Sequence, residues 1–395
     1  MKIVFFLAAG GAASVRIRHF AKCFSSKGHV VGIVSSVIFP GVKESQRVEG
    51  VRIVKAPFAI GTLHPSLRCV NVLLSFLFPP LIMLLLSPDV LVVSMPPAEP
   101  AIGAIMIRRM LGKRLVFDYR DELDYYRAGK VQGWMSRAFF RFLKKLVTLL
   151  YVNSDVATVT PSLVNKLKKR GIGKLWLVPN GADTKIFRPV DKRRVRENKA
   201  LSTRDFIVVY LGLIGDYYRL DVVVRALNML VKQYDIDNVR LILLGGGPDV
   251  RRVLRLASVL SIAENVNYLG RKQDRQEVAE VIACADIGVV PYGNHPLLKY
   301  AYPTKVFEYC ACGVPVIATA YRDSLLAGLI DENGIGLVVP PMNVEELALA
   351  VRRMYSDKKF REEAGGRARK LVEEHFDRDR VALDFLTLIE SNKGI

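Results

Sequence analysis

The chain has 395 residues, which exceeds one typical domain and favours two. Hydrophobic residues make up 51% of the sequence, a share that suits a globular protein and excludes a disordered one. The cysteines lack metal-ligand or disulfide-framework spacing, which indicates a reduced, cytosolic setting; they are Cys23, Cys69, Cys284, Cys310 and Cys312.

The net charge of +20 is concentrated in the N-terminal half of the chain. Residues 1–190 contain 28 Lys and Arg against 10 Asp and Glu, whereas the rest of the chain is nearly neutral. A basic surface attracts nucleic acid, anionic lipid or phosphorylated substrates. Nucleic acid is not expected, because the basic run Lys166–Arg170 belongs to no recognisable nucleic-acid-binding motif.

The N-terminal residues have the pattern of a strand and its loop. Lys2–Leu7 is too short for the apolar region of a signal peptide and runs into Gly10-Gly11. Further along, the apolar stretch Val72–Leu86 is interrupted by Pro79-Pro80 and is shorter than the ~20 residues of a spanning helix. We expect this stretch to form a buried or membrane-surface helix pair.

Short runs rich in Val and Ile alternate with helical patterns along the chain, which predicts parallel α/β sheets with strands buried on both faces. The alternation pauses near Pro179–Asp183 and resumes after the charged segment Asp191–Lys199. The fold class is therefore α/β, with two doubly wound, Rossmann-like domains that face each other across a cleft. The predicted strands are Val30–Ser35, Val90–Ser94, Leu115–Asp118, Val156–Thr160, Phe206–Leu211, Leu241–Leu244, Val266–Leu269, Ile287–Pro291, Val314–Ala318 and Leu337–Val339.

These patterns divide the chain into three parts. Residues 1–187 are expected to form the first domain, and residues 188–375 the second. Residues 376–395 are expected to form a C-terminal helix that packs back on the N-terminal domain. Ligands of doubly wound domains bind at the carboxyl ends of the strands, so a small-molecule site between the domains is the first hypothesis.

A dense cluster of charges follows the predicted strand at 115–118. In Val116–Leu123, Asp121 could orient or deprotonate a substrate hydroxyl, and Arg120 lies beside it in the sequence. The alternative is a solvated loop with internal ion pairs.

Gln132–Leu150 has the pattern of a basic amphipathic helix, with Arg137, Arg141, Lys144 and Lys145 on one face and aromatic residues around the rest. Such a helix suits an anionic membrane surface, and a core helix with a solvated basic stripe fits the pattern about equally well. The charge of the N-terminal half favours the membrane.

A glycine-rich turn joins the strand at 206–211 to a helix at Leu220–Val231. In this turn, Gly212 to Gly215 would let backbone N–H groups approach a phosphate, and Arg219 at the helix start could pair with a diphosphate oxygen. Taken alone, the turn is equally typical of a tight connection with a solvated arginine.

A second charged helix start precedes the strand at 314–318. Lys305 and Glu308 lie three residues apart and therefore share a helix face. The carboxylate could accept hydrogen bonds from ribose hydroxyls, and the lysine could neutralise phosphate. An intrahelical ion pair is the alternative.

The stretch Pro303–Ile317 resembles the donor-site signature of retaining glycosyltransferases of the GT-B fold, family 4. The branch with Arg-Asp in the acceptor loop is the most similar. Further motifs agree with this family in order and spacing: Lys27–Val31, Ser87–Ser94, Val178–Asp183, Phe187–Pro189, Leu244–Pro248 and Ala285–Pro291.

The resemblance implies roles for individual residues. Glu308 matches the second glutamate of the family's motif of two glutamates separated by seven residues and should bind ribose, and Arg219 matches a phosphate-binding lysine. Tyr300 replaces the first glutamate, and Leu213 replaces an arginine that contacts the diphosphate. The missing charge is expected from Lys305, Arg16 or Arg271. The remaining implied residues are Gly215, Gly246 and Thr304 at the donor, and Gly10, Gly11, Arg16 and Arg120 in the acceptor or phosphate loop.

The implied activity is transfer of a sugar from a UDP- or GDP-sugar to a glycan or lipid-linked acceptor with retention of configuration. No metal, no cofactor and no protein nucleophile are expected, since the nucleotide sugar is a substrate. The implied location is cytoplasmic and peripheral, at the inner face of the cell membrane. Alternatives are an epimerase-like enzyme that modifies nucleotide sugars, a dinucleotide-dependent oxidoreductase, which the first loop disfavours because it lacks Gly-x-Gly-x-x-Gly, and a non-catalytic membrane scaffold.

Overall fold

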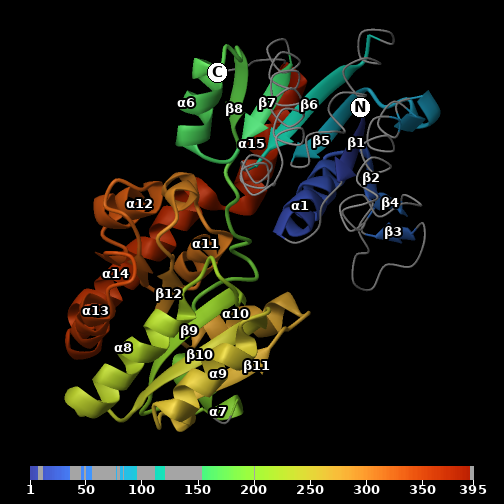
Figure 1. The fold of residues 1–395 in the computed structure, drawn as a ribbon. Helices are drawn as coiled ribbons and strands as arrows, with labels where there is room; N and C mark the ends of the chain where they lie inside the picture. Colours follow the sequence, from blue (N-terminus) through green and yellow to red (C-terminus); the bar gives the residue numbers. More distant parts are fainter. Residues whose placement is uncertain are drawn as a thin grey trace. The chain divides into compact units, whose positions relative to one another are not determined.

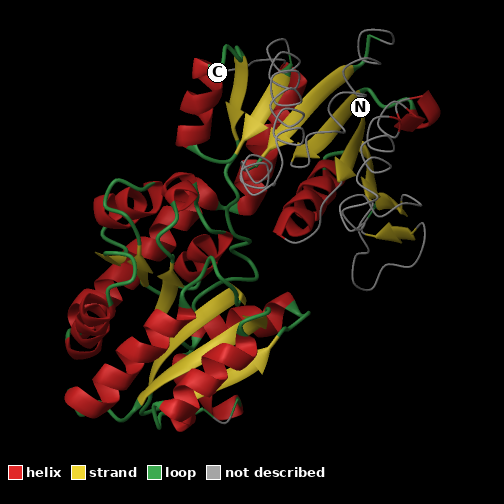
Figure 2. Cartoon of the chain, in the orientation of Figure 1, coloured by secondary structure: helices red, strands yellow, loops and turns green. Residues whose placement is uncertain are grey.

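The computed structural model describes residues 1–7, 12–35, 46–48, 50–55, 77, 81–82, 84–95, 112–120, 154–199 and 201–391. The chain forms two compact units: an N-terminal unit of Met1–Asn180 with Asp379–Ile395, and a C-terminal unit of Gly181–Arg378. Each unit is a largely parallel sheet with helices on both faces (Figures 1 and 2). The prediction of two Rossmann-like domains is therefore confirmed. The cleft between them and their boundaries after residues 187 and 375 stay predictions.

The described sheet of the N-terminal unit has the strand order β3-β4-β2-β1-β5-β6-β7-β8. Its pairs are parallel except for β3 with β4. Central strands such as β1 and β5 are buried along almost their whole length, as expected for strands covered on both faces. The strands are β1 (Lys2–Leu7), β2 (Val30–Ser35), β3 (Gln46–Val48), β4 (Val51–Lys55), β5 (Val90–Met95), β6 (Arg114–Tyr119), β7 (Asp155–Thr158) and β8 (Lys174–Leu177).

Two helices from opposite ends of the chain share one face of this sheet. Helix α1 (Ala12–Ser26) and helix α15 (Arg378–Ser391) bury aromatic and aliphatic side chains there, while α6 (Pro161–Lys169) packs on the other face. The ring of Phe385 lies 5.7 Å from that of Phe20 and 6.2 Å from that of Trp176, centre to centre. The last helix of the chain is thus part of the N-terminal core.

The sheet of the C-terminal unit has the order β11-β10-β9-β12-β13-β14 and is parallel throughout. From β9, the strands β10 and β11 follow on one side, and the strands β12, β13 and β14 follow on the other side. That reversal is the doubly wound pattern, in which ligands bind at the carboxyl edge near the switch. The strands are β9 (Phe206–Leu213), β10 (Val239–Gly246), β11 (Val266–Gly270), β12 (Ile287–Pro291), β13 (Val316–Thr319) and β14 (Gly336–Val339).

Helices cover both faces of this second sheet and bury two apolar clusters. Their ends carry the expected caps: Ser324 accepts a hydrogen bond from the Ala327 N–H, and Gly334 closes the same helix at a φ of 58°. Cys310 and Cys312 are buried, as predicted. The helices are α7 (Lys192–Asn198), α8 (Leu220–Gln233), α9 (Val250–Val259), α10 (Arg275–Ala283), α11 (Thr304–Ala311), α12 (Leu325–Asn333), α13 (Val344–Ser356) and α14 (Lys358–Leu371), with short turns η2 (Ala263–Asn265), η3 (Pro296–Tyr300) and η4 (Val372–Phe376).

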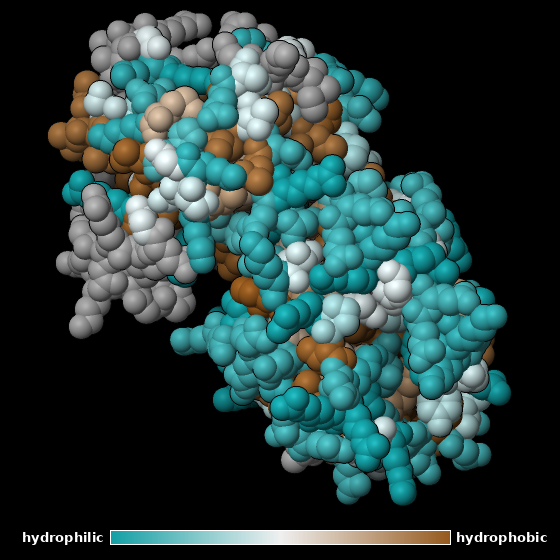
Figure 3. Space-filling view, turned by 180° about the vertical axis from the view of Figure 1, so that it is seen from behind, coloured by the Kyte–Doolittle hydropathy of each residue, from teal (hydrophilic) through white to brown (hydrophobic). Residues whose placement is uncertain are grey.

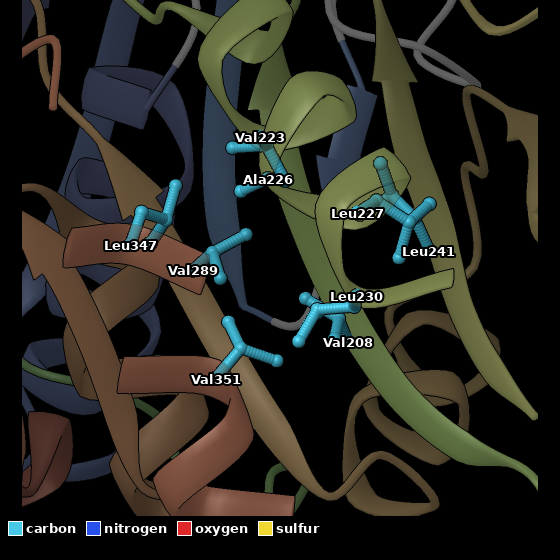
Figure 4. A pocket seen from close by; sticks show the side chains of 9 residues that line it. All are labelled: Val208, Val223, Ala226, Leu227, Leu230, Leu241, Val289, Leu347 and Val351. Atoms are coloured by element: carbon cyan, nitrogen blue, oxygen red, sulfur yellow. The ribbon is translucent and has the colours of Figure 1, made fainter. Parts of the chain in front are cut away.

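A small cavity lies inside this unit between the sheet and helices α8 and α13 (Figure 4). Its lining is entirely aliphatic and offers no side-chain hydrogen-bond partner to a polar ligand. We therefore regard it as a packing gap in the core. The lining residues are Val208, Val223, Ala226, Leu227, Leu230, Leu241, Val289, Leu347 and Val351.

The surfaces of the two units differ in one respect. The visible face of the C-terminal unit is largely hydrophilic, whereas hydrophobic side chains gather at an edge of the N-terminal unit (Figure 3). Leu77, Leu81, Leu84 and Leu85 of the N-terminal unit are all exposed, Leu85 by 73%. Among the described residues, the helices are each too short or too polar to cross a bilayer.

Candidate functional site

The two charged segments singled out in the sequence lie at the same edge of the second sheet. Because all its strands are parallel, the turns after β9, β10, β11 and β12 all leave from the carboxyl edge. The turn after β9 leads to Arg219, and the segment after β12 leads to α11 with Lys305 and Glu308. The topology therefore brings the predicted phosphate and ribose contacts into one region.

The turns after β9 and β10 approach each other so closely that they require glycine. Gly245 has a φ of 139°, and a Cβ atom there would lie 1.9 Å from the carbonyl oxygen of Gly212. A Cβ atom on Gly247 would lie 2.1 Å from the carbonyl oxygen of Ile214. The turns are also joined by a hydrogen bond from the Ile214 N–H to the Gly246 carbonyl, 3.1 Å long. They form one rigid platform beside the sheet edge.

Lys305, near the start of α11, places its side chain against the turn after β9. Its side chain is buried, and its Nζ lies 3.5 Å from the ring centre of Tyr218 and 4.0 Å from that of Tyr210. A Cβ atom on Gly212 would lie 3.1 Å from this Nζ. In the described part of the chain, the Nζ has no hydrogen-bond partner. Burial lowers the pKa of Lys305 well below its ordinary value, and the nearby charge of Glu308 only partly offsets this.

The tyrosines around Lys305 form a stacked group. Tyr218 stacks on Tyr292 with ring centres 5.6 Å apart, and it meets Tyr210 edge to face at 5.8 Å. Burial raises the pKa of Tyr218 to about 12, so its phenol is neutral at pH 7. The faces of neutral phenols attract a cation, so the group suits an ammonium without supplying a counter-charge.

Arg219 stands at the N-terminus of α8 and is partly exposed. Its guanidinium donates two hydrogen bonds to Asp221, of 2.8 and 2.6 Å. This pairing raises the pKa of Arg219 and lowers that of Asp221. The N–H of Arg219 donates to the carbonyl of Pro291 at the end of β12, which anchors the residue to the sheet edge.

Glu308 lies deeper, 4% exposed, among arginines. Its Oε1 accepts a hydrogen bond from Nη2 of Arg275, the first residue of α10. Arg378, itself buried, interacts with both residues, and burial lowers the pKa of its guanidinium. Arg275 was not among the residues predicted from the sequence. Its position in the sequence does give a hint of a special role. The first turn of a helix favours acidic residues, whereas α10 begins with the cation Arg275.

The other predicted donor residues lie along the same edge. A Cβ atom on Gly246 would lie 3.0 Å from Nε of Arg271, so this arginine covers the end of β10. Gly215 packs beside Pro248, and Thr304 is the first residue of α11. Tyr300 ends η3 and is 46% exposed. Their roles toward a donor stay predictions.

In the N-terminal unit, Arg16 and Arg120 converge on the end of β6. Arg16 is 2% exposed; it donates to the carbonyls of Val178 and Pro179, and its Nη2 lies 3.4 Å from Oδ1 of Asp118. Arg120 Nε lies 3.7 Å from Oδ2 of the same fully buried aspartate. In this conformation, the side chain of Arg16 links helix α1 to the backbone at residues 178–179. Its predicted contact with phosphate stays a prediction.

Several predicted features lie outside the described residues. They are Gly10, Gly11 and Asp121, the helix expected at Gln132–Leu150, and most of Val72–Leu86.

Comparison with known proteins finds relatives of the C-terminal unit. Residues 191–371 match the protein-family model Glycosyl transferases group 1. The N-acetyl-alpha-D-glucosaminyl L-malate synthase of Bacillus anthracis is 26% identical over 249 residues, 62% of this chain and 62% of its own. The D-inositol 3-phosphate glycosyltransferase of Mycobacteroides abscessus is 31% identical over 183 residues, 45% of this chain and 38% of its own. The chain thus spans less than two thirds of the length of these curated relatives.

Solved structures match the whole chain at low sequence identity. Sucrose-phosphate synthase from Thermosynechococcus elongatus has a TM-score of 0.79 at 18% identity and covers 99% of each chain. HepE of Anabaena, solved with UDP, has a TM-score of 0.73 at 14% identity and covers 99% of this chain and 100% of its own. The matched region contains Arg219, Lys305 and Glu308. Residues 191–371 are therefore similar to the group 1 glycosyltransferases, and the chain as a whole has the GT-B fold.

Proposed function

We propose that this chain transfers a sugar from a UDP- or GDP-sugar to a glycan or lipid-linked acceptor, with retention of configuration. The observation that carries the proposal is the position of Lys305 against the glycine turn at Gly212, with Arg219 and Glu308 also on the segments that follow β9 and β12 at the carboxyl edge of one sheet. Among the described residues, the buried Nζ of Lys305 has no hydrogen-bond partner, and its place next to backbone turns and a helix N-terminus favours an anion such as a diphosphate.

In this proposal, Glu308 accepts hydrogen bonds from the ribose hydroxyls, while Lys305 and Arg219 neutralise the diphosphate. The bond between the anomeric carbon and the phosphate oxygen breaks as the acceptor oxygen bonds to the same face of that carbon. The acceptor proton passes to the departing phosphate oxygen, and Asp121 orients the acceptor hydroxyl. Stabilisation of the charge on the leaving diphosphate is then the main catalytic contribution.

UDP is the first nucleotide to test. HepE of Anabaena was solved with UDP and with UDP-glucose, and this chain shares its fold. That likeness supports UDP over GDP without naming the sugar.

The proposed place of action is the cytoplasmic face of the cell membrane. The excess of basic residues in 1–190 and the exposed leucines near residues 77–85 support contact with anionic lipid. Flotation with anionic liposomes at low salt should retain the protein. Absence of binding would remove the membrane from the proposal.

Melting curves with UDP, GDP and ADP test the donor site first, because a ligand that binds only the folded state raises the melting temperature. Turnover of a UDP- or GDP-sugar is then measured for the wild type and for Glu308→Ala. We expect turnover that the variant loses. Failure of every UDP- and GDP-sugar to turn over would contradict the proposed function.

A further inference from the structure

Glu308 is a buried carboxylate whose hydrogen bond comes from another element. It belongs to α11, and its Oε1 accepts from Arg275 at the start of α10, 33 residues earlier in the chain. The side chain of Glu308 is 6% exposed, whereas that of Arg275 is 34% exposed. A carboxylate at this depth is costly unless a cation pairs with it, and the hydrogen bond from Arg275 fixes its orientation.

Arg275 is itself held in place. Its guanidinium carbon lies 4.7 Å from the ring centre of Phe187, which is fully buried. The Phe187 carbonyl accepts a 2.8 Å hydrogen bond from Arg369 on α14. One face of the guanidinium is therefore fixed by a ring that cannot move freely, and one edge is fixed on Glu308. A planar guanidinium held in this way fixes a carboxylate better than a flexible ammonium would.

Arg378 adds a second positive charge nearby. It is 3% exposed and donates a 2.9 Å hydrogen bond to the Gly181 carbonyl. Arg378 contributes charge near Glu308, whereas the hydrogen bond to Oε1 of Glu308 comes from Arg275.

We propose that Arg275 is a positioning residue for the donor: it holds the carboxylate of Glu308 in place through Oε1, so that the rest of the carboxylate accepts the ribose hydroxyls of a nucleoside diphosphate. This inference depends on the proposed function, because it takes Glu308 as the ribose contact. It assigns to Arg275 an effect on ribose recognition that a merely structural arginine would not have.

The test compares UDP with 2′,3′-dideoxy-UDP by calorimetric titration, with GDP and its dideoxy form as the alternative pair. The measured quantity is the affinity ratio between the ribose and dideoxyribose forms. We expect a ratio of about tenfold or more in the wild type, since hydrogen bonds to a charged group are worth about 1.5–3 kcal/mol. Arg275→Gln and Glu308→Gln should each bring the ratio close to one, and the double variant should lower it no further.

Two further variants complete the design. Arg193→Gln removes an arginine from an exposed ion pair on α7 and should keep the wild-type ratio. Arg275→Lys keeps the positive charge but loses the planar guanidinium, so it should give an intermediate affinity ratio. If Arg275→Gln does not fold, Arg275→Lys is the variant that tests the proposal.

The outcomes separate the two claims. If Arg275→Gln weakens both ligands equally and keeps the ratio, the positioning role is wrong while the donor site stands. If the wild type binds both forms equally, Glu308 is not the ribose contact, and this inference fails while the proposed function stands. If it binds neither the UDP pair nor the GDP pair, the proposed function fails as well.

Discussion

The ammonium of Lys305 lies 3.5 Å from the centre of the Tyr218 ring, buried and without a hydrogen-bond acceptor in the described chain. Such a group lowers stability in the empty protein and is useful only if a ligand supplies the missing negative charge. The arrangement therefore suggests a cost in stability that is offset when a diphosphate binds.

Lys305→Met should raise the melting temperature of the ligand-free protein at pH 7 and reduce the shift that UDP produces. The pKa of Lys305 is lowered in the folded state. At pH values up to the ordinary lysine pKa of about 10.4, the unfolded chain therefore binds more protons than the folded protein. The stability of the wild type thus increases with rising pH. The difference in melting temperature between Lys305→Met and the wild type should therefore narrow between pH 7 and pH 10. Melting curves across this range measure the gap.

The control is Lys232→Met on the exposed surface of α8, which should follow the wild-type pH profile. A gap between Lys305→Met and the wild type that stays constant with pH would show that Lys305 is not a desolvated amine.

Arg219→Ala should weaken UDP binding by roughly tenfold, because a charge-assisted contact with phosphate is worth about 1–2 kcal/mol at a partly exposed site. The loss should shrink at high salt, which screens exposed charges. Titration calorimetry at two salt concentrations measures both effects. Arg225→Ala, exposed on the same helix, should leave the affinity unchanged, and an equal loss there would point to a general effect of charge.

Gly245→Ala should destabilise the C-terminal unit by more than about 3 kcal/mol, because the added Cβ would lie 1.9 Å from the Gly212 carbonyl oxygen at a φ of 139°. Urea denaturation measures the change. Gly366→Ala, within α14 and with no atom near the added Cβ, should instead stabilise by about 0.5–1 kcal/mol. A mild effect at Gly245 would contradict the close approach of the two turns.

Arg16→Met should destabilise the N-terminal unit by about 3–5 kcal/mol, because it leaves the buried carboxylate of Asp118 without its closest cation. The double variant Arg16→Met/Asp118→Asn should recover part of this loss. Urea denaturation of the wild type and of both variants measures the change in the free energy of unfolding. Additive losses would show that the two side chains do not act as a pair.

Strand positions were predictable where apolar runs end in polar residues. The runs Val30–Ser35 and Ile287–Pro291 match β2 and β12 to the residue. β3 was not predicted, because its three residues, Gln46–Val48, carry no apolar run and pair only with the neighbouring strand. The run at 156–160 is shifted from β7, because Thr160 instead caps α6 by accepting from the Leu163 N–H.

Side-chain partners were less predictable than strands, since they join residues distant in the chain. The sequence placed Glu308 and Lys305 on one helix face and could not show that Arg275 would bind the first and two tyrosines would surround the second. Arg16 was expected at a phosphate, while its carbonyl partners lie more than 160 residues away. Such contacts depend on how the strands are ordered in the sheet, which local patterns do not encode.

A crystal structure of the protein with UDP tests the central claim most directly. The account predicts the ribose hydroxyls within hydrogen-bonding distance of Glu308, and the diphosphate beside the Gly212–Gly215 turn with Arg219 or Lys305 in contact. UDP bound elsewhere, or a ribose that leaves Glu308 paired only with Arg275, would contradict it.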